Sequence, residues 1–554
     1  LWLLCLLSLL VGSARGAEGS KSRSCAEVRQ LFGAKGFSLN DVPQSEISGE
    51  HLQICPQGYT CCSSEMEEKL QLKARGDFEQ LLQDSSSSLQ FLLATNAKKF
   101  QEHFEELLNI SENYLNALFS KTYGRLYPQN AEMFKDLFTE LRLYYRGSNI
   151  NLEEALNEFW ARLLERAFKQ LHGQYDSPDD YLECLRKARE DLKPFGDIPR
   201  RLMLQVTRAL VAARTFLQGL NVGIEVVSKV DQVPLSKECS RALLKMIYCP
   251  HCRGLPSVKP CYGYCLNVMR GCLANQADLD PEWRGYIDSL ELLADKMLGP
   301  YDIENVILSI HTKISEAIMA LQENGVKLTA KVFQGCGTPK PTPYGSASGP
   351  EDKRSKRPLK PEERPTTETL ERLVVEFKEK LKKVKSFWST LPGTLCSDRM
   401  AASAADDDPC WNGDGVGRYL QEVVGNGLAN QINNPEVEVD GSKPDMVIRQ
   451  QIDKLKHMTN RLLAAASGND VDFQDASDDS SGSGSGDGCG DDDCGGYGSA
   501  KVSSTRDPDP HDTPGESEQE GQKDVGSSGS TAGSPPALLL LTSMLILVVQ
   551  RLLW

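Results

Sequence analysis

Cysteine is the residue that most limits how this chain can fold. The chain holds 17 cysteines, of which Cys5 lies in an apolar N-terminal stretch and Cys489 and Cys494 lie in an acidic, glycine-rich tail. The remaining fourteen fall between these two segments. The even number behind the N-terminal stretch is consistent with complete pairing in an oxidising compartment. Residues 17–466 are enough for two or three ordinary domains, but the cysteines predict one elongated body held together by disulfides instead.

The two ends of the chain indicate export and membrane attachment. Leu1 to Val11 is almost wholly apolar, and small residues precede Ala17, which is typical of a secretory signal peptide at 1–16. Near the other end, 537–549 is an uncharged run of only thirteen residues, whereas a bilayer-spanning helix needs about twenty. A marginal transmembrane helix is the alternative.

A patch of small residues, 526–534, precedes that apolar run and ends at two prolines. Small residues, a short spacer and an apolar end are the signal for replacement of the tail by a glycosylphosphatidylinositol (GPI) anchor. We expect attachment at Ser528, with Ser527 and Ser530 as alternatives, and removal of 529–554 as the anchor signal. The protein would then lie on the extracellular face of the cell membrane, and release of a shed, secreted form is compatible with this placement.

Three Ser-Gly pairs stand in the acidic segment 470-DVDFQDASDDSSGSGSGDGCGDDDC-494, which has nine Asp and no Lys or Arg. Glycine and repelling like charges keep such a segment from burying a core, so we expect 467–528 to be a disordered stalk. Acidic residues beside repeated Ser-Gly are similar to the acceptor sites on which glycosaminoglycan chains are started, which makes Ser481, Ser483 and Ser485 the candidate attachment residues. An unmodified Gly/Ser linker is the alternative.

The span between the ends predicts an all-α fold. Helical patterning runs from about 65 to 175, where Phe100, Phe104, Leu107, Leu108, Ser111, Leu115 and Leu118 recur at spacings of three and four. Asn151 with Glu154 suits an N-cap for a second apolar stripe, Leu152 to Phe168. Further helices are predicted at about 203–220, 283–298, 302–333, 368–388 and 445–465, and we interpret their aromatic stripes as core.

Two cysteine-rich segments, 24–69 and 239–272, are predicted to form one lobe. Cys61 and Cys62 are neighbours and cannot readily bridge each other, so each should pair with a distant cysteine. Cys249-Pro-His-Cys252 followed by Cys261 and Cys265 has the spacing of a zinc ribbon. Behind a signal peptide, disulfides are the better interpretation, and we expect no metal in the core.

Residues 337–366 are rich in Pro and charge, which predicts a disordered insertion. Arg354-Ser-Lys-Arg357 within it matches the pattern that furin-like convertases cut after Arg357, and a solvated basic run is the alternative. Asn109-Ile-Ser111 is an N-glycosylation acceptor sequence on the polar side of a predicted helix.

Catalytic patterns are missing from the sequence. Its seven His stand outside metalloprotease-type motifs, and neither a nucleophile elbow nor a phosphate-binding glycine loop is present. We therefore expect no enzymatic activity and no required cofactor. The net charge of −15 argues against nucleic acid as a partner.

Several segments together carry a family resemblance: 25-CAEVRQLFGAKGFSLNDVP-43, 53-QICPQGYTCCSSEMEE-68, 159-FWARLLER-166, 270-RGCLANQADLD-280 and 425-GNGLANQINNPEVEVD-440. With fourteen core cysteines, Ser-Gly repeats and an anchor signal, the chain resembles the glypicans, which are GPI-anchored heparan sulfate proteoglycans. The resemblance implies a cylindrical all-α core and heparan sulfate on the Ser-Gly repeats. It also implies seven disulfides: Cys25–Cys61, Cys55–Cys249, Cys62–Cys252, Cys184–Cys336, Cys239–Cys272, Cys261–Cys410 and Cys265–Cys396.

The resemblance further implies a co-receptor that presents or sequesters ligands through heparan sulfate. Expected partners are growth factors and morphogens of the fibroblast growth factor, Wnt, Hedgehog and BMP classes, together with collagen and other matrix proteins. The alternative is that the core binds Wnt- or Hedgehog-type ligands directly. A smaller hypothesis concerns Cys489 and Cys494: reduced, their thiolates among carboxylates could bind Cu²⁺ or Zn²⁺, whereas a disulfide between them is the alternative.

Overall fold

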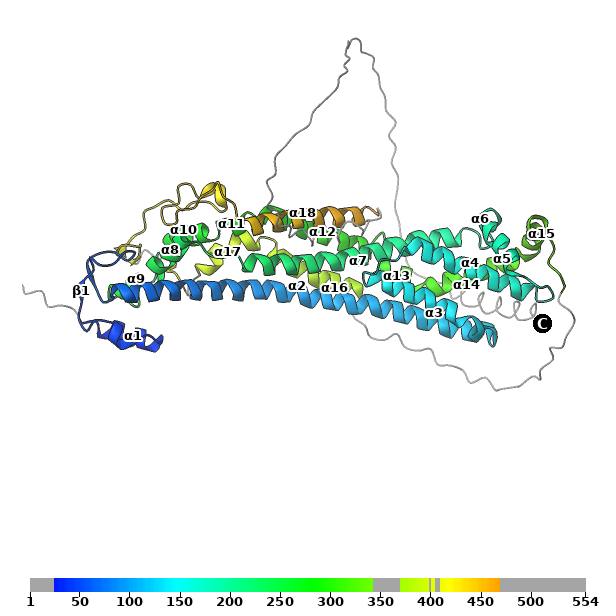
Figure 1. The fold of residues 1–554 in the computed structure, drawn as a ribbon, viewed down its shortest axis with the longest axis horizontal. Coiled ribbons are helices and arrows are strands. Elements are labelled where there is room, and N and C mark those ends of the chain that lie inside the picture. Colours follow the sequence, from blue (N-terminus) through cyan, green and yellow to red (C-terminus); the bar gives the residue numbers. More distant parts are fainter. Residues whose placement is uncertain (1–23, 342–368, 398–399, 404–408, 469–554) are drawn as a thin grey trace, which may run out of the picture. The chain divides into compact units, whose positions relative to one another are not determined.

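The computed structural model describes residues 24–341, 369–397, 400–403 and 409–468 (Figure 1). The chain divides into two compact units, Leu1–Val471 and Asp472–Trp554, and all described residues belong to the first. Within the described ranges the elements are eighteen α-helices, two short 3-10 helices and four two-residue strands. The predicted all-α fold class is therefore confirmed.

One helix sets the length of this unit. α2 (Ser64–Tyr123) holds 60 residues and extends about 90 Å at the usual rise per residue. It begins where the Ser63 hydroxyl accepts the backbone N–H of Met66 at 3.2 Å, which satisfies one of the free donors of the first turn. It ends at Gly124, whose φ of 53° carries no Cβ penalty.

Two helices follow α2 and pack against each other. α3 (Leu126–Tyr145) packs on both α2 and α4 (Leu152–Leu171). The Asn151 side chain accepts the backbone N–H groups of Glu153 and Glu154, both at 3.1 Å, so the predicted N-cap is confirmed. The apolar stripe of α4 is buried as predicted.

The predicted stripe on α2 needs one correction. The stripe residues from Phe100 to Leu115 are buried as predicted. At its end, however, Leu118 is only half-buried and the neighbouring Phe119 is buried instead. Phe119 faces α3, where its ring lies 6.0 Å from that of Tyr127 and 5.1 Å from that of Phe134. The aromatic contact with α3 decides which of the two neighbouring side chains turns inward.

α7 (Ile198–Asp231) runs beside α2 through the centre of the unit and also packs on α12 (Asp280–Leu298) and α18 (Met446–Ala466) (Figure 1). The predicted end of this helix at 220 is wrong, because the helix continues to Asp231. Gly219 leaves room for Leu290 of α12 and Leu462 of α18, and its carbonyl accepts the Tyr286 hydroxyl of α12 at 2.8 Å. A Cβ at Gly223 would clash with the Tyr286 hydroxyl, so close packing explains glycine inside this helix.

Among the described helices α7 alone is long and apolar enough to cross a membrane, and 67% of that apolar window is buried. Its neighbours, which include α2, α12 and α18, are helices of the same unit. α7 is therefore a core helix.

The predicted helix at 302–333 is wrong as a single element. The structure divides it into α13 (Ile303–Leu308), α14 (Ile310–Glu323) and α15 (Gly325–Cys336). The Asn324 side chain donates to the Ala320 carbonyl at 3.0 Å, and Gly325 follows it. Polar side chains that bond to nearby backbone, and glycine, both weaken a helix interior.

The other helices are shorter. The predicted helix at 368–388 forms α16 (Leu370–Val384) and α17 (Phe387–Leu395), with Trp388 buried at the start of α17. The rest are α1 (Ala26–Ala34), α5 (Asp179–Lys187), α6 (Arg189–Leu192), α8 (Lys237–Ile247), α9 (Cys249–Cys252), α10 (Tyr262–Cys272), α11 (Ala274–Ala277), and the 3-10 helices η1 (Leu39–Asp41) and η2 (Leu428–Asn430).

The four strands make two antiparallel pairs. β1 (Ile47–Ser48) pairs with β2 (Tyr59–Thr60), with Ile47 opposite Thr60. β3 (Cys410–Trp411) pairs with β4 (Val416–Gly417), with Cys410 opposite Gly417. Both pairs lie in the cysteine-rich part of the chain, where they orient disulfide-bonded segments.

Candidate functional site

Of the seven disulfides among the described residues, six lie in one lobe, at the end of the unit where α2 begins (Figure 1). The lobe joins the predicted segments 24–69 and 239–272 to residues 391–397, 400–403 and 409–411. Its disulfides are Cys25–Cys61, Cys55–Cys249, Cys62–Cys252, Cys239–Cys272, Cys261–Cys410 and Cys265–Cys396. The seventh, Cys184–Cys336, joins α5 to α15. These are the same seven pairs that the family resemblance implies.

The neighbouring cysteines 61 and 62 separate in the way that the sequence predicts. Cys61 reaches back to Cys25, and Cys62 reaches α9 at Cys252. The Cys252 carbonyl accepts the Cys61 backbone N–H at 2.8 Å and the Thr60 hydroxyl at 3.2 Å. All four cysteines with zinc-ribbon spacing are in disulfides, so none of their sulfur atoms is a thiolate that could bind a metal.

Glu67 anchors the start of α2 to the lobe and was not predicted. Its side chain is 4% exposed, and its carboxylate accepts the backbone N–H groups of Gln53, Ile54 and Cys55 at 2.8, 2.9 and 2.7 Å. Three charge-assisted hydrogen bonds offset the burial of a carboxylate. The only sequence signal for this role is an acidic residue on the buried face of a predicted helix.

Asn267 of α10 anchors the segment after α17 to the lobe by side-chain hydrogen bonds, as Glu67 anchors the start of α2. It is fully buried, and its amide donates to the Tyr419 hydroxyl at 2.9 Å and to the Glu422 carbonyl at 2.8 Å. Its side-chain oxygen accepts the Val424 N–H at 2.9 Å. Tyr419 in turn donates to Glu436 at 2.8 Å, and burial raises the pKa of that carboxyl group above its ordinary value.

The lobe's chemistry is that of a cross-linked scaffold. All fourteen cysteines of the described ranges are oxidised, and within those ranges no group of three or more His, Cys, Asp or Glu could hold a metal ion. Burial lowers the pKa of His251 to about 4, so its imidazole is neutral at physiological pH. This arrangement fixes loops and surfaces in place.

The acceptor sequence for N-glycosylation lies on α2. Asn109 is exposed, and its side-chain oxygen accepts Nη2 of Arg142 at 3.0 Å. Ser111 is fully buried, and its hydroxyl donates to the Ile307 carbonyl of α13 at 2.6 Å. The Ser111 hydroxyl is therefore accessible to a modifying enzyme only before α2 packs on α13.

Replacing Ser111 by alanine should remove both the glycan and a buried hydrogen bond, whereas replacing Asn109 should remove the glycan but keep that hydrogen bond. Both Ser111→Ala and Asn109→Gln remove the acceptor, so both chains should lose the N-glycan in mass spectrometry. Ser111→Ala also loses the buried hydrogen bond to Ile307, which should lower the free energy of unfolding by about 1 kcal/mol relative to Asn109→Gln. Denaturant unfolding of the two unglycosylated chains measures this difference, and equal midpoints would contradict it.

Other predicted residues lie outside the described residues. They are Ser481, Ser483 and Ser485, the anchor candidates Ser527, Ser528 and Ser530, Arg357, and Cys489 with Cys494. The structure does describe what would hold a chain cut after Arg357. The Cys261–Cys410 and Cys265–Cys396 disulfides join the sequence before the insertion to the sequence after it, so the two pieces would remain one molecule.

Comparison with known proteins covers nearly the whole chain. The glypican family model matches residues 3–553. Human glypican-1 is 61% identical over 554 residues, which is 100% of this chain and 98% of that protein. A crystal structure of the full-length glypican-1 core protein has a TM-score of 0.74 at 60% identity and covers 81% of this chain and 100% of its own. The structure of Dally-like protein in complex with O-palmitoleoyl serine has a TM-score of 0.63 at 32% identity, with the same coverage. This chain is a member of the glypican family.

Proposed function

We propose that this chain is the core protein of a cell-surface heparan sulfate proteoglycan that captures growth factors, morphogens and matrix proteins through its sulfated chains. The observation that carries the proposal is membership of the glypican family along 3–553 together with three Ser-Gly pairs in an acidic tail. Ser481, Ser483 and Ser485 are the proposed attachment residues. Residues 1–16 would be removed on export, and Ser528 would receive the lipid anchor as 529–554 is released.

The described core suits this arrangement. α18 ends at Ala466, shortly before the acidic tail, so the proposed sulfated chains would start near one defined point of the folded unit. As a flexible coil, which its composition favours, the 467–528 tail would have an r.m.s. span of about 45 Å. That tail would carry the core above the membrane and keep the sulfated chains between core and lipid.

Heparan sulfate binds basic protein surfaces largely by releasing counterions, as nucleic acids do. Many weak sites on one polymer raise the local concentration of a ligand beside its receptor. In this mechanism the core positions and anchors the polymer, and ligand specificity lies in its sulfation.

Mass spectrometry of the 467–500 segment before and after heparinase digestion tests the proposal. Heparinase should convert a heterogeneous, high-mass segment into species that keep only a short linkage stub on one or more of the three serines. A segment of unmodified mass from cells that make heparan sulfate would contradict the proposal.

A second candidate is direct binding of a lipid-modified morphogen by the folded core. It is favoured by the Dally-like structure, which holds O-palmitoleoyl serine and has a TM-score of 0.63 to this chain. The heparinase-treated protein discriminates between the two. Binding of a palmitoleoylated peptide that persists after digestion assigns that ligand to the core, whereas binding that disappears assigns it to the sulfated chains.

A further inference from the structure

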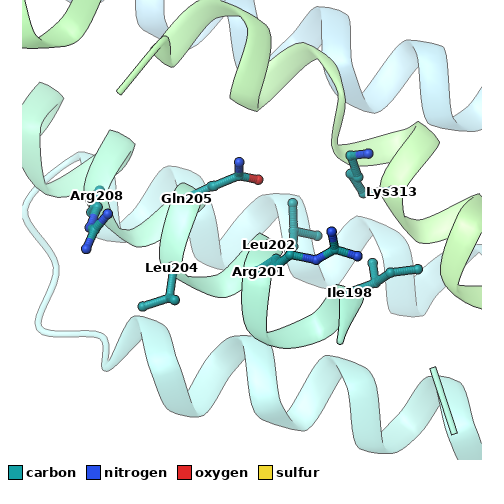
Figure 2. A pocket seen from close by; sticks show the side chains of 7 residues that line it. All are labelled: Ile198, Arg201, Leu202, Leu204, Gln205, Arg208 and Lys313. Atoms are coloured by element: carbon teal, nitrogen blue, oxygen red, sulfur yellow. The ribbon is translucent and has the colours of Figure 1, made fainter. Parts of the chain in front are cut away.

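The first three turns of α7 border a pocket of about 300 Å³ (Figure 2). Arg201, Gln205 and Arg208 come from α7, and Lys313 comes from α14. Ile198, Leu202 and Leu204 supply its apolar surface. The described residues that line this pocket therefore hold three cations and no carboxylate.

Arg201 and Arg208 are the accessible charges of the pocket. Both are exposed, and a separation of seven residues places them on the same helix face about 10 Å apart along the axis. In the described part of the chain neither guanidinium group makes an ion pair, whereas Lys313 pairs with Glu316 at 2.9 Å. Two uncompensated positive charges thus face solvent on a chain whose net charge is −15.

A second pocket of about 270 Å³ lies at the start of α7, and Pro199, Arg200 and Met203 line it from the side of the helix opposite to Arg201 and Arg208. Its lining includes Arg189, Lys193 and Arg200, together with Glu190 and Asp197. Lys193 pairs with Asp197 at a distance of 3.7 Å, and both side chains are 69% exposed, so a competing anion can reach them. The basic surface of α7 is therefore the one that Arg201, Arg208 and Lys313 form at the first pocket.

We propose that this surface binds a sulfated glycosaminoglycan segment, with Arg201 and Arg208 as its main contacts. Two exposed guanidinium groups separated by two helical turns match a polymer that carries repeated sulfates better than they match an isolated ion. Guanidinium groups also offer the paired donors that planar or tetrahedral oxyanions accept. The exposed Leu204 and half-buried Ile198 provide apolar contact for the C–H faces of sugar rings.

This inference deepens the proposed function and rests on it for the source of the ligand. A heparan sulfate chain held by the core would be restrained in direction near its origin. It would leave fewer sulfates free for growth factors than the same chain in solution.

The test uses the full chain with Ser481, Ser483 and Ser485 replaced by alanine, so that binding of added polymer to the core is measured without attached polymer. The probe is a fluorescent heparin-derived hexasaccharide, titrated over a range of NaCl concentrations. Arg201→Ala with Arg208→Ala should weaken binding at least about tenfold at low salt and make the slope of log K against log salt shallower by roughly one to two. Arg201→Lys with Arg208→Lys should retain most of the salt slope, because the charges remain.

The matched control removes two arginines that already pair with carboxylates. Arg75 lies 2.8 Å from Glu79 and Arg146 lies 3.1 Å from Glu105, so Arg75→Ala with Arg146→Ala should leave hexasaccharide binding nearly unchanged. Equal weakening by the control pair, or unchanged binding by the Arg201 and Arg208 variant, would overturn the inference.

Two further arms identify the ligand. An acidic peptide of the same net charge should bind at least about tenfold more weakly than the hexasaccharide, and equal binding would assign the surface to acidic proteins instead. Sodium sulfate should compete no better than chloride at matched ionic strength, and displacement by low sulfate concentrations would reduce the site to a small-anion site. Since the variant chain carries no attached polymer, these outcomes do not depend on whether the native serines are modified.

Discussion

Replacing Ser481, Ser483 and Ser485 together by alanine is expected to abolish heparan sulfate attachment and, with it, salt-sensitive binding of a fibroblast growth factor. Many weak polymer sites raise apparent affinity by factors of about 10²–10⁴, so the loss should be at least about 100-fold. Surface plasmon resonance of the purified chain at low and high salt measures it. The binding that remains should lose the steep salt dependence typical of a polyanion.

The control for this experiment uses serines of the same tail that glycine does not follow. Ser477, Ser503 and Ser504 precede Asp, Ser and Thr respectively. Their joint replacement by alanine should leave polymer attachment and growth factor binding unchanged. If the Ser481, Ser483 and Ser485 variant still bound a fibroblast growth factor in a salt-sensitive way, the proposed mechanism would be wrong.

The sequence predicts the long helices well because each exposes one face and buries the other. The apolar stripes of α2, α4 and α16 follow the helical period, and their interior positions are largely the buried ones. The helical period of apolar residues predicts less well where contacts between helices decide which residues are helical or buried. In the sequence, Gly223 predicts a weak point in the helix that becomes α7. The fold places the Tyr286 hydroxyl of α12 where a Cβ of residue 223 would lie, and this contact between distant residues explains the glycine.

The candidate sites were likewise predictable where the signal is a local pattern, and not where distant residues meet. Acceptor sequences such as Asn109-Ile-Ser111 are local patterns, so they are visible in the sequence. The burial of Ser111 is not visible there, because the carbonyl that it contacts belongs to Ile307, which is far along the chain. The basic pocket likewise joins Arg201 to Lys313, and neither residue stands in a motif.

Replacing Phe377 by alanine is expected to cause the largest loss of stability of any single core change considered for this chain. Phe377 of α16 is fully buried, and its ring centre lies 5.6 Å from that of Phe100 on α2 and 5.8 Å from that of Phe216 on α7. Phe100 and Phe216 also contact each other at 4.9 Å. Truncating a buried phenylalanine costs about 3–5 kcal/mol, and two edge-to-face pairs are lost with it.

Val375 provides the control on the same helix. Its side chain is 54% exposed, so Val375→Ala should change the free energy of unfolding by no more than about 0.5 kcal/mol. Guanidinium unfolding with the disulfides intact compares the two variants. Similar midpoints for Phe377→Ala and Val375→Ala would show that the three-ring cluster does not hold α16 in place.

The three-ring cluster also holds α16 in position, which matters because α16 follows the insertion. α16 is the first described helix after the insertion, and the nearest disulfides that follow it are at Cys396 and Cys410. If the chain is cut after Arg357, α16 is covalently tethered only through its C-terminal side, so packing by Phe377 must keep its N-terminal side on α2 and α7. In the cut Phe377→Ala chain, the backbone amides of α16 should therefore exchange hydrogen faster than those of α18. In the cut Val375→Ala chain, the amides of both helices should be equally protected from exchange.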